Sequence, residues 1–379
     1  MNAILVIAIA ATLLTSLLIA VRWGSTVCQG SMPSSLFAFS AILFTSGLDV
    51  GLIMFPLTEF PVYAEEAAYQ FANPLAIEFG MWGFLVWAFY FLTTFYFCRI
   101  EPRLQLFEIP IIKFVNNFVV IATCAFTGFL FLSYLPSYVE GISPIAQYSL
   151  VFLVVICAVF SSTDIRYVKV LSIASTWLFF ALIAFLWINS KMGLIGFLNS
   201  SSNLSEYFGN LHRFLSPLSD YHAFYLFWWF SWSIMIGQFV SRFLSPMKTR
   251  SLLAALLIIP SIPIAVWFSV LYYYHTHDVE LTKSVNLCLV TVGVIFVINS
   301  LDSLIRLYTT NLGITVERLG RRNYVLFNAV ALLALILLYR FTPFEIEWVG
   351  LVVIGLYGCI YFLLFRRREK LSSVMVADA

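Results

Sequence analysis

Long apolar runs recur from one end of this chain to the other. A run of about 18 or more apolar residues can span a bilayer as a helix, because a helix satisfies its backbone hydrogen bonds within the segment. With 61% hydrophobic and 11% charged residues, the chain has too little polar surface to cover a water-soluble globule. We therefore predict an all-α integral membrane protein with about eleven transmembrane helices. The runs fall at about 3–21, 35–57, 76–98, 114–135, 145–161, 168–189, 222–244, 251–273, 284–308, 324–340 and 348–365.

The positions of the basic residues predict the orientation. Cytoplasmic segments of membrane proteins are enriched in Lys and Arg. With eleven crossings and a cytoplasmic C-terminus, 17 of the 21 Lys and Arg residues lie on the cytoplasmic side. We therefore expect the N-terminus outside, and most acidic residues, Glu59 among them, in outer loops. The basic residues that follow the last run are Arg366, Arg367, Arg368 and Lys370.

The stretch Phe224–Gln238, FYLFWWFSWSIMIGQ, places three tryptophans well inside one apolar run. Transmembrane tryptophans usually lie at the membrane interfaces, where the indole N–H reaches water. Trp232 is four residues from Trp228 and three from Trp229, so on a helix the three share one broad face. Indole faces attract cations, and aromatic cages are a recurrent way to hold quaternary ammonium groups. The cluster favours such a cage over the alternative, a packed aromatic core.

Two carboxylates, Asp49 and Asp302, fall inside the runs as we count them. Charged groups are costly in hydrocarbon and usually face a cavity or a partner. Asp49 lies between Gly47 and Gly51, a pattern typical of a discontinuous helix whose freed carbonyls hold an ion. Close helix packing through the two glycines is the alternative interpretation. Asp302 precedes Arg306 by about one turn, and we expect a structural ion pair between them.

Three more aromatic residues lie at a matching depth in another run. Trp82, Trp87 and Tyr90 lie about as far below the outer surface as the tryptophans of Phe224–Gln238, at 1.5 Å of rise per residue. The glycines around Asp49 lie at a similar depth. We therefore expect three helices to bring aromatic faces and an opened backbone together near the bilayer centre.

These segments resemble the betaine/choline/carnitine transporter family. Residues 224–233, FYLFWWFSWS, look like the family signature FYWAWWISWS, which is the most specific part of the resemblance. Residues 41–59, AILFTSGLDVGLIMFPLTE, are similar to its glycine-rich broken helix, and residues 82–90, WGFLVWAFY, keep its tryptophan and tyrosine spacing. Residues 259–270 and 297–303 resemble two further family segments. The resemblance covers most of the chain from about residue 21 onward.

The resemblance implies a LeuT-type fold with a five-plus-five inverted repeat, in which a broken helix opens each repeat. It divides the chain into an extra N-terminal helix and loop (1–34), a first repeat (35–189), an outer loop with an interfacial helix (190–221), a second repeat (222–365) and a short cytoplasmic tail (366–379). Family members usually have twelve helices, so this chain is expected to be a shortened member that lacks the first. The resemblance also implies a multi-pass protein of the bacterial inner membrane.

Site residues follow from the same resemblance. The substrate cage would be formed by Trp82, Trp87, Tyr90, Trp229 and Trp232, with Trp228 on the adjoining pathway. The ion-coupling region at the broken helix would include Thr45, Gly47, Leu48, Asp49 and Gly51, with backbone carbonyls from Thr45 and Leu48. The lower cation site of sodium-coupled members would correspond to Phe296, Asn299 and Ser300. Either Na+ or H+ is expected as the coupling ion.

The implied function is import of a quaternary ammonium compound, of the betaine, choline or carnitine type, by alternating access. Asp49 stands where the family has a glycine, and Tyr221 stands where the signature has its first tryptophan. These departures keep open an alternative, a non-transporting binding protein or receptor-like paralogue of the same fold. In a transporter, Asp49 would add a fixed charge near the substrate or titrate with protons, and a structural carboxylate in an ion pair or hydrogen bond is the alternative for this residue. We expect contact with lipid, a homotrimer as the implied assembly, and no enzymatic activity, resident cofactor, metal site or nucleic-acid partner.

Overall fold

The protein is described here by a computed structural model that covers residues 1–48 and 50–371. Helices make up nearly all of it. The first half contains α1 (Asn2–Arg22), β1 (Val27–Cys28), α2 (Leu36–Gly47), α3 (Val50–Met54), α4 (Pro56–Glu65), η1 (Ala67–Tyr69), α5 (Pro74–Trp82), α6 (Phe84–Arg99), α7 (Glu101–Leu104), η2 (Leu106–Glu108), α8 (Pro110–Tyr138), α9 (Pro144–Ser161) and α10 (Arg166–Asn189).

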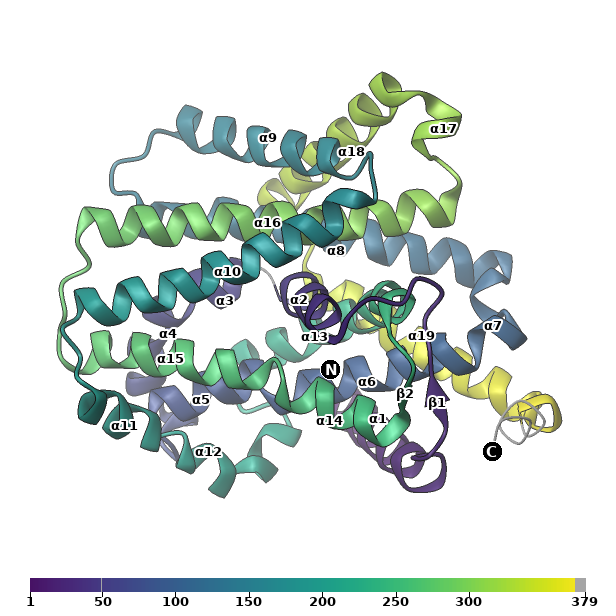
Figure 1. The fold of residues 1–379 in the computed structure, drawn as a ribbon, viewed down its shortest axis with the longest axis horizontal. Coiled ribbons are helices and arrows are strands. Elements are labelled where there is room, and N and C mark those ends of the chain that lie inside the picture. Colours follow the sequence, from purple (N-terminus) through teal and green to yellow (C-terminus); the bar gives the residue numbers. More distant parts are fainter. Residues whose placement is uncertain (49, 372–379) are drawn as a thin grey trace.

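The second half is equally helical. It contains α11 (Leu194–Ser202), α12 (Ser205–Gly209), η3 (Leu211–Leu215), α13 (Asp220–Val240), η4 (Ser241–Phe243), β2 (Met247–Lys248), α14 (Thr249–Ile258), α15 (Ser261–Thr276), α16 (Lys283–Leu312), α17 (Val316–Leu319), α18 (Arg321–Phe341) and α19 (Ile346–Arg366). The two short strands pair antiparallel. The long helices lie side by side in stacked layers, with α9 and α18 at one edge (Figure 1).

The membrane prediction agrees with the helices. Ten helical segments of the described chain are long and apolar enough to cross a membrane, and they coincide with ten of the predicted runs. α5 with α6, and α14 with α15, each form one of these segments. The remaining run, 35–57, corresponds to the shorter α2 followed by α3 and the start of α4. The prediction of an all-α, multi-pass membrane protein is therefore confirmed.

The first repeat opens with a discontinuous helix, as the glycine pattern predicts. α2 ends at Gly47, Leu48 has extended backbone angles (φ −129°, ψ 149°), and helix resumes at Val50. Asp49 lies outside the described residues. A further interruption follows at Pro56, which begins α4 and has no N–H to donate into the preceding turn.

The expectation of a second broken helix at the start of the second repeat is wrong. α13 is continuous over 21 residues from Asp220 to Val240. It contains no proline, and its one glycine, Gly237, lies in the last turn, so nothing in its sequence interrupts the helical hydrogen bonds.

Helix packing repeats between the two halves of the chain. α2 packs against α10 as α13 packs against α19, and α8 packs against α18 and α19 as α16 packs against α9 and α10. The two longest helices, α8 and α16, have 29 and 30 residues and occupy equivalent places. The kinked span of α5 (9 residues) and α6 (16) matches that of α14 (10) and α15 (16). This is the five-plus-five arrangement of the LeuT-type fold, while the repeat limits 35–189 and 222–365 remain a prediction.

The predicted outer loop is helical, but its helices are short. α11, α12 and η3 replace the single interfacial helix that we expected within 190–221. α11 is fixed to α15 by a hydrogen bond of 2.8 Å from the Ser200 hydroxyl to the Ser269 carbonyl. Glu206 of α12 accepts a hydrogen bond of 2.6 Å from the backbone N–H of Asn73, just before α5. The loop thus holds the outer ends of the two spans together.

Two glycines of α19 offer a test of this packing. A Cβ atom on Gly350 would lie 2.5 Å from the Phe227 carbonyl oxygen of α13, whereas one on Gly355 would have no neighbour within 4 Å. We expect Gly350→Ala to destabilise the protein by about 1–3 kcal/mol, because overpacking forces the helices apart. Gly355→Ala should leave stability unchanged or raise it slightly, since Ala favours helix. Thermal unfolding of both purified variants in detergent measures the difference, and equal midpoints would contradict the described α13–α19 contact.

Candidate functional site

Three tryptophans from two spans form one contiguous aromatic cluster. The Trp82 ring of α5 lies 4.9 Å from that of Trp229 and 5.6 Å from that of Trp228, centroid to centroid, with interplanar angles of 73° and 83°. The rings of Trp228 and Trp229 are nearly parallel, at 11°. All three side chains are buried, with exposed fractions of 3% or less. The structure thus brings together, in the protein interior, two residues assigned to the substrate cage, Trp82 and Trp229, and Trp228, assigned to the adjoining pathway.

The kink between α5 and α6 fixes two indoles. The last carbonyls of a helix have no partner within that helix. At this kink the Met81 carbonyl accepts a hydrogen bond of 2.7 Å from Nε1 of Trp229, and the Trp82 carbonyl accepts one of 3.2 Å from Nε1 of Trp87. Three further indole nitrogens are buried without a hydrogen-bond partner among the described residues, those of Trp82, Trp228 and Trp232.

Trp87 and Tyr90 form a second aromatic group, against the broken helix. Their rings meet edge to face with centroids 5.3 Å apart. The Tyr90 hydroxyl donates a hydrogen bond of 3.2 Å to the Gly47 carbonyl, where α2 ends. A Cβ on Gly47 would lie 3.3 Å from Tyr90 and 3.5 Å from Trp87, so glycine allows this close approach. Trp232 is buried on α13, but within residues 1–48 and 50–371 no ring pair connects it with either group.

The residues predicted for the cation site lie beside the broken helix and α10. The Ser300 hydroxyl of α16 lies 3.0 Å from the Leu48 carbonyl and 3.4 Å from the Thr45 carbonyl, and donates to them. Asn299 accepts a hydrogen bond of 3.4 Å from Ser172, while its Nδ2 is buried without a partner in the described part of the chain. Phe296 packs edge to face on Phe44 of α2, 6.2 Å between centroids.

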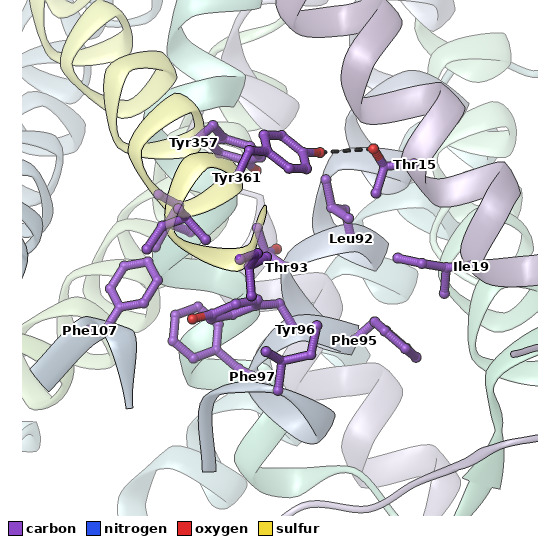
Figure 2. Close-up of a pocket in the computed structure, with 14 residues that line it drawn as sticks. Thr15, Ile19, Leu92, Thr93, Phe95, Tyr96, Phe97, Phe107, Tyr357 and Tyr361 are labelled. Carbon is purple, nitrogen blue, oxygen red and sulfur yellow. Dashed lines mark hydrogen bonds between the residues drawn. The ribbon is translucent and has the colours of Figure 1, made fainter. Parts of the chain in front are cut away.

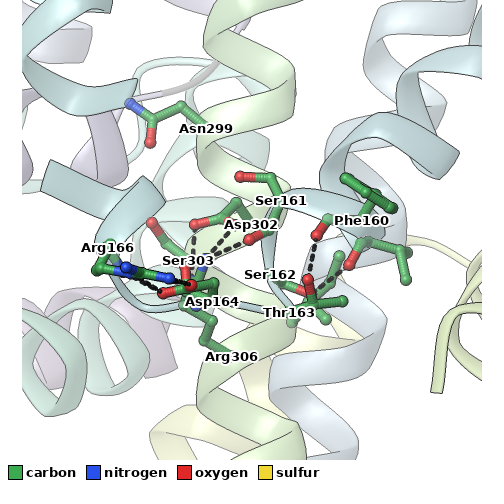
Figure 3. A network of polar contacts seen from close by, with 12 residues as sticks. Phe160, Ser161, Ser162, Thr163, Asp164, Arg166, Asn299, Asp302, Ser303 and Arg306 are labelled. Carbon is green, nitrogen blue, oxygen red and sulfur yellow. Dashed lines mark hydrogen bonds and ion pairs between the residues drawn. The ribbon is translucent and has the colours of Figure 1, made fainter. Parts of the chain in front are cut away.

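The expected ion pair between Asp302 and Arg306 is confirmed. Arg306 donates to both oxygens of Asp302, at 2.9 Å each, and both side chains are buried. Figure 3 shows the guanidinium reaching the end of α9, where it also donates to the carbonyls of Ser161 (2.5 Å) and Asp164 (2.7 Å). The pair is therefore structural, and it fastens α16 to the turn between α9 and α10.

Besides this ion pair, the structure contains a pair of buried acidic residues that the sequence analysis did not predict. Glu59 of α4 and Glu78 of α5 are only 3% and 0% exposed. This burial corrects the assignment of Glu59 to an outer loop. The count of two carboxylates within spans is also wrong, because Glu78 belongs to the span Pro74–Arg99. Tyr63, Tyr221 and Tyr225 all donate hydrogen bonds to Glu59. The sequence carried a signal that we did not use, a tyrosine four residues from each of Glu59 and Tyr221.

The hollow shown in Figure 2 lies away from these groups. It is apolar and sits among α1, α6 and α19, with Thr15, Thr93 and Tyr361 on its wall. Tyr361 donates a hydrogen bond of 3.0 Å to Thr15, which ties α19 to α1. Because the tryptophan cluster does not line it, we do not assign substrate to this hollow.

Comparison with known proteins points to one transporter family. The model of the BCCT family, described as betaine/carnitine/choline family transporters, matches residues 108–277. An uncharacterized transporter of Haemophilus influenzae is 29% identical over 62% of this chain and 42% of its own length. The glycine betaine transporter OpuD of Bacillus subtilis is 24% identical over 62% of this chain and 54% of its own length.

The match to these relatives is partial in length. The chain spans about half the length of the two curated relatives, 42% and 54%. A solved structure of a Na+-coupled sialic acid symporter in a substrate-bound, outward-open state aligns with 94% of this chain and 82% of its own, at 14% identity and a TM-score of 0.47.

The Asp302–Arg306 pair generates a stability prediction. Asp302→Ala leaves a buried guanidinium without its counter-charge, which typically costs about 3–5 kcal/mol. We expect a clear fall in the thermal unfolding midpoint, partly reversed in the double variant Asp302→Ala/Arg306→Met, because removing both charges removes the unpaired one. Arg166→Gln is the control, since Arg166 pairs with Asp164 in an exposed position. A single variant as stable as the control would contradict a structural role.

Proposed function

Because the chain belongs to the betaine/carnitine/choline transporter family, we propose that it carries a small quaternary ammonium compound across the membrane by alternating access. It is a multi-pass protein of the bacterial inner membrane, as its ten apolar spans and its bacterial relatives indicate. The proposal extends to a homotrimeric assembly and to betaine, choline or carnitine as substrate. The tryptophan cluster is the observation that carries it.

The ring geometry supports a cation site. Aromatic rings have a negative face and a positive edge, so edge-to-face pairs place positive charge on a neighbouring π face. Trp82 forms such pairs with Trp228 and Trp229. A trimethylammonium group offers the same positive charge, without any N–H that would need an acceptor. It would therefore replace ring edges on these faces, with roughly 0.5–2 kcal/mol gained per ring.

Substrate binding requires the cluster to open. The rings of Trp82 and Trp229, 4.9 Å apart, are in direct contact. No ammonium group fits between them at this separation, so the structure corresponds to a closed site. Entry of substrate would separate the α5–α6 span from α13, and the unpartnered Nε1 atoms of Trp82 and Trp228 would then be available to a substrate oxygen.

A coupling ion, Na+ or H+, is part of the proposal. The carbonyls of Thr45 and Leu48 would be its ligands at the broken helix, together with the Ser300 hydroxyl. In the structure, the Ser300 hydroxyl donates its hydrogen toward these carbonyls, which satisfies them without an ion. Binding of sodium would turn that hydrogen away. Asp49 retains its proposed role beside this site, in charge compensation or coupling, although it lies outside the described residues.

Uptake into proteoliposomes tests the function. Radiolabelled choline, glycine betaine and carnitine are supplied in turn under an imposed sodium gradient, an imposed proton gradient or neither. We expect at least one compound to accumulate above the level reached without an imposed gradient. Saturable binding without accumulation would instead favour the non-transporting binding protein, and the absence of both would contradict the proposal.

Substitution of Trp229 tests the cage itself. Trp229→Leu removes the π face, and we expect substrate affinity to fall about 2- to 30-fold, as the loss of one cation–π contact implies. Trp229→Phe keeps a π face and should lose less, although both variants lose the hydrogen bond to Met81. Trp348→Leu is the control, because Trp348 is 56% exposed on the outer face of α19. Equal affinities for the Leu and Phe variants would argue against a π contact with substrate.

A further inference from the structure

Glu59 and Glu78 form an acidic pair of unequal character. Glu59 accepts hydrogen bonds from Tyr63 (2.7 Å), from Tyr225 (2.9 Å to each oxygen) and from Tyr221. Glu78 is fully buried, and neither of its oxygens has a hydrogen-bond partner in the described part of the chain. Glu59, Tyr63 and Trp82 are close enough to interact with it.

The two carboxylates share one environment that does not suit two negative charges. Like charges held close together in a buried site cannot both ionise, so such a pair retains a proton. Three phenol donors stabilise the negative charge on Glu59. Glu78 has no hydrogen bond of comparable geometry among residues 1–48 and 50–371, and neither residue has an ion pair there. The proton therefore belongs on Glu78, with Glu59 as the anion.

This pair adjoins the tryptophan cluster. Glu78 and Trp82 are four residues apart on α5, which places their Cβ atoms about 6 Å apart on one helix face. The Tyr225 side chain links the two groups, because its hydroxyl binds Glu59 and its ring lies 5.8 Å from that of Trp82. A cation held by the tryptophans would lie within electrostatic reach of both carboxylates.

From this juxtaposition we propose that Glu59 and Glu78 form a one-proton site whose protonation is linked to the charge of the substrate in the adjacent tryptophan cluster. The inference rests on the proposed function and names its coupling group. A ligand with net positive charge favours loss of the proton from Glu78, so cation and proton compete. A zwitterion carries no net charge, so its binding depends less on the proton.

The sign of the pH effect follows from this competition. At low pH the pair holds its proton, and a cation must displace it. As the pH rises, fewer protons compete with the cation, so the pair releases its proton more easily when the cation binds. Choline affinity should therefore rise with pH, by up to about tenfold per pH unit where one proton is released per ligand bound. Glycine betaine should show a smaller dependence.

Other titratable groups surround the pair and have to be separated from it. Tyrosines face it from four elements, with hydroxyl groups that ionise only at high pH. The side chain of a histidine ordinarily changes its charge between about pH 5 and 8. His275 of α15 is such a residue, and its ring is 5.6 Å from that of Phe60, the neighbour of Glu59 in the sequence. Other titratable groups on the surrounding elements include Tyr63, Glu65, Tyr69, Tyr134, Tyr138, Glu206, Tyr207, His212, Arg213, Asp220, Tyr221, His222, Tyr225, Tyr272, Tyr273 and Tyr274.

The test measures binding of choline and of glycine betaine to the full chain in detergent, between about pH 5.5 and 8.5. Wild type, Glu78→Gln and the control His275→Gln are compared, each in sodium-containing and sodium-free buffer. We expect a steep pH dependence for choline in wild type and His275→Gln, and a flat response in Glu78→Gln. An infrared spectrum of the unliganded protein provides a second readout, in which the C=O band of a protonated carboxyl should disappear in Glu78→Gln.

Each alternative outcome overturns a defined part. Choline binding independent of pH in wild type, or a pH dependence that survives Glu78→Gln, would contradict the proton site. An equal dependence for betaine would contradict the link to ligand charge. If ligand binding depended on sodium in wild type but not in Glu78→Gln, and did not depend on pH in either, the pair would be a sodium site. If neither ligand binds at any pH, the proposed function fails, while the infrared band still decides whether Glu78 holds a proton. If Glu78→Gln does not fold, the difference between the pH dependence of choline binding and that of betaine binding in wild type decides the matter.

Discussion

Backbone carbonyls that are freed inside the membrane hold this structure together. In hydrocarbon no water can satisfy them, so a broken helix needs donors from its neighbours. The break after α2 and the interruption at Pro56 leave carbonyls at four described positions, and each is met by a side chain of a different helix. The pairs are Gly47 with Tyr90 of α6, Leu48 with Ser300 of α16, Leu52 with Trp267 of α15 (2.7 Å) and Met54 with Tyr138 of α8 (2.5 Å). The segment formed by α2, α3 and α4 is thus the centre to which four other helices are fastened.

The same rule positions the tryptophan cluster. At the kink of α5 and α6, indole N–H groups satisfy the carbonyls of Met81 and Trp82. These bonds set the orientation of Trp229 and Trp87, and Trp82 packs against Trp228 and Trp229 of α13. The indole N–H groups of Trp82, Trp228 and Trp232 are buried without a partner among the described residues, and an unsatisfied buried donor typically costs about 1–3 kcal/mol. Under the proposed function, a ligand with an acceptor oxygen would supply a missing partner and so favour opening of the cluster.

Much of this arrangement could be predicted from the sequence because it depends on local patterns. Length and hydropathy predict the spans, the glycines around residue 49 predict the first break, and i, i+4 spacing predicts the Asp302–Arg306 pair. The acidic pair escaped because its members lie on different helices and each looked unremarkable alone. Glu59 followed the apparent end of one run, and Glu78 stood near the start of another. Only the packing of α4, α5 and α13 shows that Tyr221, a departure from the family signature, donates to Glu59.

The continuous α13 has a related physical cause. The resemblance implies two equivalent broken helices, but a break needs a residue that cannot continue the helix. Gly47 and Pro56 supply this in the first repeat, whereas the 21 residues of α13 do not include such a residue before Gly237. The repeats therefore share their packing and differ in their opening helices. Among the described residues, the freed carbonyls of an opening helix lie in the first repeat, whereas the tryptophan cluster combines α5 of the first repeat with α13 of the second.

The central claim is that rings of the α5–α6 span and of α13 separate to hold a quaternary onium group. An experimental structure with the arsenic analogue of choline, in which arsenic replaces nitrogen, tests it directly because anomalous scattering locates that atom. We predict the arsenic within about 6 Å of the ring centroids of Trp82 and Trp229, with those rings farther apart than their present 4.9 Å. Arsenic bound elsewhere at saturation, with the two rings still in contact, would contradict the account.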